Sequence, residues 1–255
     1  MRSRALGLLA GLVLISASLP GCASLDPGPR ATEQREVDDV SVVELATGGS
    51  LTVALGSTPS LRITAGERII DRLTADVDAG VLRLGIEDEP FGYAGEIQYE
   101  LVVSSLSSIS VLGSGEASVD FAGEDDPEIV VRGSGRVDAA GIDAESVSLT
   151  LDGSGEIDVS GAAAQQLTVR IDGSGAVRID GEVADQEVEL RGPGEYSASD
   201  LKSRDARVTV RGSGEASVAA SDTLDAVVDG SGEISYAGDP RVTKEIAGSG
   251  ELLRD

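Results

Sequence analysis

Residues 147–179 read VSLTLDGSGEIDVSGAAAQQLTVRIDGSGAVRI, and within them the tripeptide Gly-Ser-Gly returns after 20 residues. The tripeptide or a near copy occurs eight times in the chain, and Pro193 once replaces its serine. At intervals of 18 to 20 residues, its first glycines are Gly113, Gly133, Gly153, Gly173, Gly192, Gly212, Gly230 and Gly248. A fixed period of this size indicates a stacked architecture in which each unit buries its apolar edge against the next.

Apolar and polar residues alternate on both sides of each tripeptide. Leu149 and Leu151 precede the one at Gly153, and Ile157 and Val159 follow it. Period two with β-branched residues predicts strands with one buried face, and no repeat shows the periodicity of an amphipathic helix. Each unit is therefore expected to be a strand, a glycine corner, a second strand and a polar return.

A unit of about 20 residues has too few strands to close a core of its own. A propeller blade needs roughly 40 residues, so the alternative is a coil with one unit per rung and rungs ~4.8 Å apart. The sequence thus predicts an all-β, single-chain β-helix, or β-solenoid, with the tripeptides along one edge. Stacked inside it we expect Ile157, Val177, Tyr196, Ala216 and Ile234.

The strand pattern continues upstream from Val40 to Val103 without a helical interruption. We therefore predict one elongated domain over residues 37–255. Irregular strands in residues 37–108 would cap the regular repeats of residues 109–255.

Residues 1–21 have the pattern of a secretory signal peptide. Arg2 and Arg4 precede a short apolar run that is too short for a membrane span. The run ends in Leu19-Pro20-Gly21-Cys22, which resembles the bacterial lipobox, in which cleavage leaves a lipid-modified cysteine at the new N-terminus. Cys22 is the only cysteine, so no intrachain disulfide accounts for it. The alternative is an incidental small residue near an ordinary cleavage site.

Lipidation of Cys22 would place the protein in the bacterial envelope. Ala23 and Ser24 lack the aspartate that tends to hold lipoproteins of diderm bacteria at the inner membrane, which favours the outer membrane. Residues 22–36 then form a polar tether between the lipid and the domain.

The chain is strongly acidic, with a formal net charge of −25. Nucleic acid is excluded as a partner, because binding it requires a cationic surface. Direct adsorption to an anionic membrane is disfavoured for the same reason, which makes a covalent lipid the sensible membrane anchor. The ligand partners left open are an envelope protein or a polysaccharide.

Candidate catalytic residues and cofactor sites are not found. The chain has no His, which excludes His-based triads, His-ligated metals and His general bases. Gly-Ser-Gly is neither the nucleophile elbow of hydrolases nor, without a following Gly-Lys, a phosphate loop.

A column of carboxylates follows the tripeptides and is called here the Glu column. Its positions are Glu116, Arg136, Glu156, Ala176, Glu195, Glu215, Glu233 and Glu251. The last four would stack as like charges, and three interpretations are open: a row of Ca²⁺ sites, a glycosidase or lyase site, or a solvated edge. We favour the solvated edge, with each Glu reaching spare backbone amides of the glycine corner.

The residue before each tripeptide suggests how the rungs are aligned. Arg132 and Asp152, Asp172 and Arg191, and Arg211 and Asp229 lie in adjacent units. We expect them to pair across rungs as exposed ion pairs worth ~0–1 kcal/mol each, which fix the register more than they stabilise the fold.

The lipobox, strand segments such as Leu61-Arg62-Ile63-Thr64-Ala65, and the serial Gly-Ser-Gly-Glu units together resemble the head GIN domain family. The resemblance covers roughly Val40 to Glu251. It implies a right-handed β-helix in a secreted or envelope-anchored protein, described as an autotransporter-adhesin head, and it carries no catalytic residue. We therefore expect a non-catalytic binding, adhesion or structural module. The alternative is a polysaccharide-acting lyase or hydrolase on a β-helix scaffold.

Overall fold

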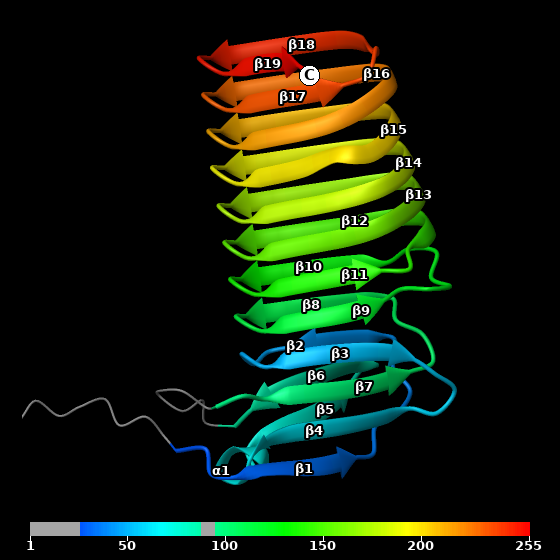
Figure 1. Cartoon of the computed structure of the whole chain (residues 1–255), viewed down its shortest axis with the longest axis vertical. Coiled ribbons are helices and arrows are strands. Elements are labelled where there is room, and N and C mark those ends of the chain that lie inside the picture. The colour runs from blue at the N-terminus through cyan, green and yellow to red at the C-terminus, as the bar shows by residue number, and fades with distance from the viewer. Residues whose placement is uncertain (1–25, 88–94) are drawn as a thin grey trace, which may run out of the picture.

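The computed structural model describes residues 26–87 and 95–255. Its strands form a single sheet wound into a β-solenoid of about seven turns (Figure 1), as the tripeptide period predicts. The elements are β1 (Arg30–Arg35), β2 (Val42–Leu45), β3 (Ser50–Leu55), β4 (Ser60–Gly66), α1 (Glu67–Ile70), β5 (Leu73–Asp78), β6 (Val81–Ile86), β7 (Gln98–Val103), β8 (Ser108–Gly113), β9 (Glu116–Asp120), β10 (Glu128–Gly133), β11 (Arg136–Ala140), β12 (Asp143–Gly153), β13 (Glu156–Gly173), β14 (Ala176–Gly192), β15 (Glu195–Gly212), β16 (Glu215–Gly230), β17 (Glu233–Ala237), β18 (Arg241–Gly248) and β19 (Glu251–Arg254).

The glycine corners stack on one edge of the solenoid, in parallel register from rung to rung. Gly133 aligns with Gly153, and Gly153 with Gly173. The backbone of Gly153 has a φ of +127°, and a Cβ on it would lie under 3.0 Å from the carbonyl oxygen of Gly133. A Cβ on Gly155 would meet the carbonyl oxygen of Gly135 in the same way. Both glycines of the tripeptide are therefore required by the close approach of neighbouring rungs.

The predicted interior column is confirmed. Ile157, Val177, Tyr196, Ala216 and Ile234 are in register and buried, with exposed fractions of 3% or less. Fully burying an aliphatic side chain contributes roughly 1.5–3 kcal/mol, so the repeated column is a main source of cohesion between rungs.

The returns differ from the expectation, because they also pair from rung to rung. In β13 and β14, Ala163 aligns with Glu182 and Ala164 with Val183. The strands before and after each glycine corner form the first and second faces of the coil. Strands β13 to β16 therefore continue past the second face, and their returns form a third face. The short polar segments have this conformation because each can hydrogen-bond to the same segment in the next rung.

The N-terminal part departs most from a simple coil. Strand β2 pairs with both β6 and β8, and β3 pairs with both β7 and β9. Strands β2 and β3 therefore lie between strands that come later in the sequence. Strands β1, β4 and β5 make antiparallel pairs, and the short helix α1 follows β4. Figure 1 shows this part as the lower end of the rod.

Two sequence expectations are corrected in this part of the chain. The expected tether over residues 22–36 is too long, because Arg30–Arg35 pairs with β4 along its whole length and belongs to the domain. The expected absence of helix is also wrong: Ile69 and Ile70 of α1 are buried, and they anchor this single turn in the core.

The expected signal peptide and Cys22 lie outside the described residues. Within residues 26–87 and 95–255, no helix has the length and apolar character needed to span a membrane.

Candidate functional site

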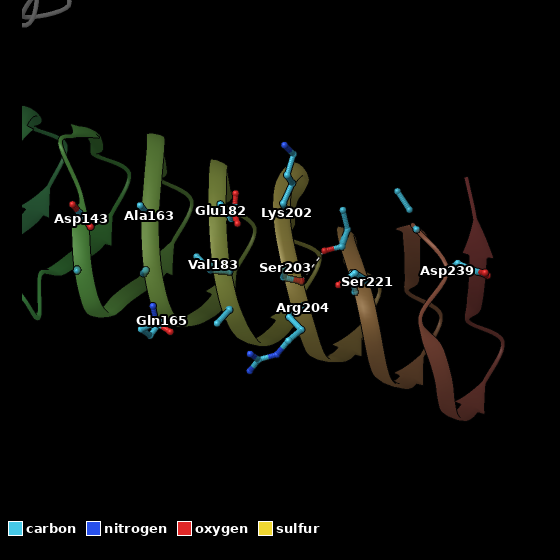
Figure 2. A pocket seen from close by; sticks show the side chains of 17 residues that line it. Asp143, Ala163, Gln165, Glu182, Val183, Lys202, Ser203, Arg204, Ser221 and Asp239 are labelled. Carbon is cyan, nitrogen blue, oxygen red and sulfur yellow. Dashed lines mark hydrogen bonds between the residues drawn. The ribbon is translucent and has the colours of Figure 1, made fainter.

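A groove runs along the third face, over the returns of six consecutive rungs, and is called here the return groove (Figure 2). Its volume is about 950 Å³. Because rungs lie ~4.8 Å apart, the six returns span roughly 24 Å along the axis of the solenoid. The middle residues of the returns form its floor and are small or buried: Ala144, Ala164, Val183, Ser203, Ala220 and Gly238.

Two rows of outward side chains form the rims of the groove. One row contains Asp143, Ala163, Glu182, Lys202, Ala219 and Ala237. The other contains Gln165, Ala184, Arg204, Ser221 and Asp239. Figure 2 shows Glu182 and Lys202 on one side of the groove and Gln165 and Arg204 on the other. Both rows include alanine or serine beside longer side chains, so the groove is open at several rungs.

The two basic residues of the groove differ in their ionic contacts. Arg204 is held by two aspartates: its Nη2 lies 3.1 Å from Asp185 Oδ1, and its Nε lies 2.9 Å from Asp205 Oδ2. These carboxylates raise the pKa of the guanidinium, and the main cause is the hydrogen bond that Arg204 donates to Asp205. Lys202 is exposed and has no ion pair with any residue that the structure describes. It is therefore a cation available to a ligand.

A buried polar network lies beneath the groove floor. The Tyr196 hydroxyl donates to Gln186 Oε1 at 3.1 Å, and Gln186 Nε2 donates to Ser203 Oγ at 2.8 Å. Ser203 Oγ in turn donates to the carbonyl oxygen of Ala219 at 2.7 Å. Burial raises the pKa of the Tyr196 hydroxyl, which keeps it a neutral donor. The network lies under the floor at the rung that carries Lys202 on one rim and Arg204 on the other.

Sequence reasoning missed this network. It placed Tyr196 inside correctly but gave no role to Gln186 and Ser203. Gln186 occupies the inward position that Leu167 takes one rung earlier, and its side chain is only 2% exposed. Two features of the sequence could have indicated the network. Gln186 is a single amide in an otherwise apolar column, and Tyr196, on the next strand, is the only aromatic residue between β12 and β16.

The last four residues of the Glu column are brought into register, as expected. Glu195, Glu215, Glu233 and Glu251 align from rung to rung. None of them has an ion pair in the described part of the chain, and Glu195 accepts a hydrogen bond from Ser197 at 2.8 Å. Residues 26–87 and 95–255 contain no group of three or more acidic side chains placed to hold a metal ion.

The corner amides do not cap the Glu side chains, which corrects the sequence argument. The backbone amide of Ser154 donates to Gly133 O at 2.8 Å, and that of Glu156 donates to Gly135 O at 2.9 Å. The same pattern repeats in most other corners, and at Gly192 the tripeptide has Pro193, which has no amide hydrogen. The amides of the serine and of the residue after the tripeptide are used between rungs, so they are not available to the Glu side chains.

Two of the three expected cross-rung ion pairs are present. Arg132 lies 3.5 Å from Asp152, and Arg191 lies 3.4 Å from Asp172. Arg211 aligns with Asp229 but instead contacts Glu189, which also receives Arg170 and Arg191. A carboxylate shared by three guanidiniums thus replaces the simple pair.

A second charged cluster lies on the second face and is relevant to the enzyme alternative. Arg136 and Arg178 both contact Glu156 and Asp158, so these four side chains form an ionic quartet, and Arg136 also lies 3.7 Å from Asp138. Burial raises the pKa of Asp158, although Arg136 opposes the effect. The two arginines cannot act as a general base, because guanidinium groups stay protonated at physiological pH, and both carboxylates are held in ion pairs. The contacts in the quartet favour a structural role across three rungs.

Solved structures share this architecture. A protein from Parabacteroides distasonis named a "putative lipid binding protein" has a TM-score of 0.80 and 26% identity, over 89% of this chain and 97% of its own. A "putative adhesin" from the same species has a TM-score of 0.78 and 20% identity, over 89% and 98%. One from Parabacteroides merdae has a TM-score of 0.77 and 18% identity, over 89% and 97%. No curated protein matches this chain.

The family comparison covers most of the solenoid. Residues 40–166 and 153–240 match the family described as "Putative auto-transporter adhesin, head GIN domain". Together the two matches include the interleaved N-terminal strands and nearly all the glycine corners. This chain belongs to the head GIN domain family.

Proposed function

We propose that this protein is a non-catalytic binding module of the bacterial envelope, anchored by a lipid on Cys22, and that its ligand lies in the return groove. The groove is the observation that carries the proposal. It extends over six rungs, a hydrogen-bonded network lies beneath its floor, and it offers one cation, Lys202, that has no ion pair among the described residues. Extended concave surfaces of this kind are how repeat proteins bind extended ligands.

The relatives support an adhesive role at the envelope. Their names describe adhesins and a lipid-binding protein, which are non-catalytic roles. The net charge of −25 also makes a covalent lipid more suitable than adsorption for holding the protein at an anionic membrane. In this arrangement the acidic rod extends away from the membrane surface.

The groove is tested by narrowing it. Ala163 is exposed on one rim, and Ala163→Trp would place an indole in the path of a ligand. Ala54→Trp is the matched control, because Ala54 is exposed on β3, away from the groove. We expect binding of the purified mature protein to envelope fractions to fall about tenfold or more for Ala163→Trp alone. Equal binding by both variants would contradict the groove as the site.

The anchor is tested separately by Cys22→Ala. One myristoyl-length chain gives marginal binding, whereas the diacyl and amide-linked chains of a lipoprotein hold it firmly. We expect wild-type protein to sediment with membranes and the variant to remain in the soluble fraction. A variant that still sediments would show that another part of the protein, or a partner, holds it.

The enzyme alternative has one specific observation in its favour, the ionic quartet beside a second cavity of about 610 Å³. This cavity is lined by Asp138, Asp158, Arg178, Asp180 and Asp200 among others. Polysaccharide cleavage that is lost in Asp158→Asn but kept in Ala163→Trp would support it over the binding module.

A further inference from the structure

We propose that the return groove binds a linear, mostly neutral polysaccharide with isolated carboxylate groups, and that one such carboxylate pairs with Lys202. The inference rests on the proposed function of the groove and names the chemistry of its ligand.

The floor suits a chain of sugar rings. Ala144, Ala164 and Ala220 are small, so the apolar face of a ring can approach the backbone closely. None of the described residues that line the groove is aromatic, so each ring gains little contact and a long ligand is needed for adequate affinity. The six returns provide that length, roughly 24 Å at ~4.8 Å per rung.

The rims suit hydroxyl groups. Asp143 and Glu182 are exposed and have no ion pair in the described part of the chain, and Gln165 lies on the opposite rim. Ionised carboxylates only accept hydrogen bonds, and sugar hydroxyls can donate them. These carboxylates would repel a polyanion, so a ligand with a charge on every unit is disfavoured.

Lys202 provides the place for an isolated negative charge. It is one of only two lysines in the chain and has no ion pair among the described residues, whereas Arg204 opposite is held by Asp185 and Asp205. The next rung has Ala219 and Ser221 on its two rims, so the groove widens beside the lysine. A carboxylate on a branch or ring can reach the ammonium group there.

A peptide fits the groove less well. The return segments already pair rung to rung, as Glu182 does with Lys202 and Ser203 with Ala220. The floor therefore has no free strand edge on which a peptide could add by β-augmentation, and the amides of a bound peptide would lack backbone partners. An anionic lipid surface would be repelled by the acidic rims and by the net charge of −25.

The test compares two oligosaccharides that differ in one group. The probes are a xylose hexamer with one glucuronic acid branch and the same oligosaccharide with that carboxyl reduced to an alcohol. We expect the mature full-length protein to bind the acidic form about two- to fivefold more tightly, as one exposed charge pair allows. Lys202→Met should abolish the difference. Lys244→Met, at the other lysine of the chain, should leave it unchanged.

The outcomes distinguish an error in the ligand assignment from an error in the assignment of the groove as the binding site. Equal binding of both forms, with loss in Ala163→Trp, would overturn the role of Lys202 while the groove stands. No binding of either form would overturn the polysaccharide assignment, as would tighter Lys202-dependent binding of an acidic hexapeptide or of phosphatidylglycerol vesicles. Unchanged binding in Ala163→Trp would contradict the groove itself. Thermal melting of each variant checks that the fold is kept.

Discussion

At the residue scale, the repeated glycines are explained by crowding between rungs. At Gly153 the backbone angle and the nearby carbonyl of Gly133 both exclude a side chain. Gly161 also has a positive φ, +65°, but a Cβ there would meet nothing within 4 Å. We expect Gly153→Ala to lower the free energy of unfolding by about 3 kcal/mol or more, and Gly161→Ala by only ~1 kcal/mol. Denaturant unfolding measures both, and equal losses would contradict the steric explanation.

A second residue-scale prediction concerns the buried network. Tyr196→Phe leaves Gln186 Oε1 without its donor, in a site where the glutamine is 2% exposed. We expect a loss of about 1–3 kcal/mol in the free energy of unfolding. Adding Gln186→Leu to Tyr196→Phe removes the unsatisfied amide and restores the apolar column, so most of the loss should be recovered. A double variant whose losses simply add would show that the two groups do not interact.

At the element scale, the response to salt distinguishes two interpretations of the Glu column, a solvated edge and a row of cation sites. Stacked carboxylates ~4.8 Å apart repel each other by roughly 1 kcal/mol per pair in water. We expect NaCl and CaCl₂ at matched ionic strength to raise the melting temperature equally, because screening is the common cause. Glu215→Gln with Glu233→Gln should then stabilise slightly. A Ca²⁺-specific rise that this double variant abolishes would establish a cation site.

The elements also show what the sequence can and cannot predict. The tripeptide period and the alternation around Ile157 predict the coil, the corner edge and the interior, because each repeats the same local constraint. The groove depends on which side chains meet when the returns stack, and the sequence shows those returns only as polar segments. The insertion of β2 and β3 between later strands is set by long-range pairing, which leaves no periodic trace. The role of Gln186 in the core can be recognised only when the Tyr196 hydroxyl, its hydrogen-bond donor, is known to lie close to it.

At the scale of the whole molecule, β18 and β19 form the last described rung, and β18 pairs with β16 alone. Lys244 aligns with the buried Ala226, so a charge occupies an inward position beside Val242 and Ile246, which are each 38% exposed. Inward charges on an open edge disfavour stacking by another chain.

We therefore expect Lys244→Val to promote end-to-end association, measured as a rise in mass by sedimentation at increasing protein concentration. Lys202→Val is the control, because it removes the same charge from the side of the rod. If both variants stay equally monomeric, the lysine does not protect this edge.

The interleaved layer of β2 and β3 sets an order of assembly. A chain that emerges N-terminus first cannot complete this layer until β9 has followed, because both of its neighbours come later in the sequence. Completion of this layer therefore has to wait for about the first half of the polypeptide. Growth afterwards is stepwise, since each new coil needs only the one before it. Evolution can thus lengthen or shorten the rod beyond β9 by whole coils without disturbing the interleaved layer.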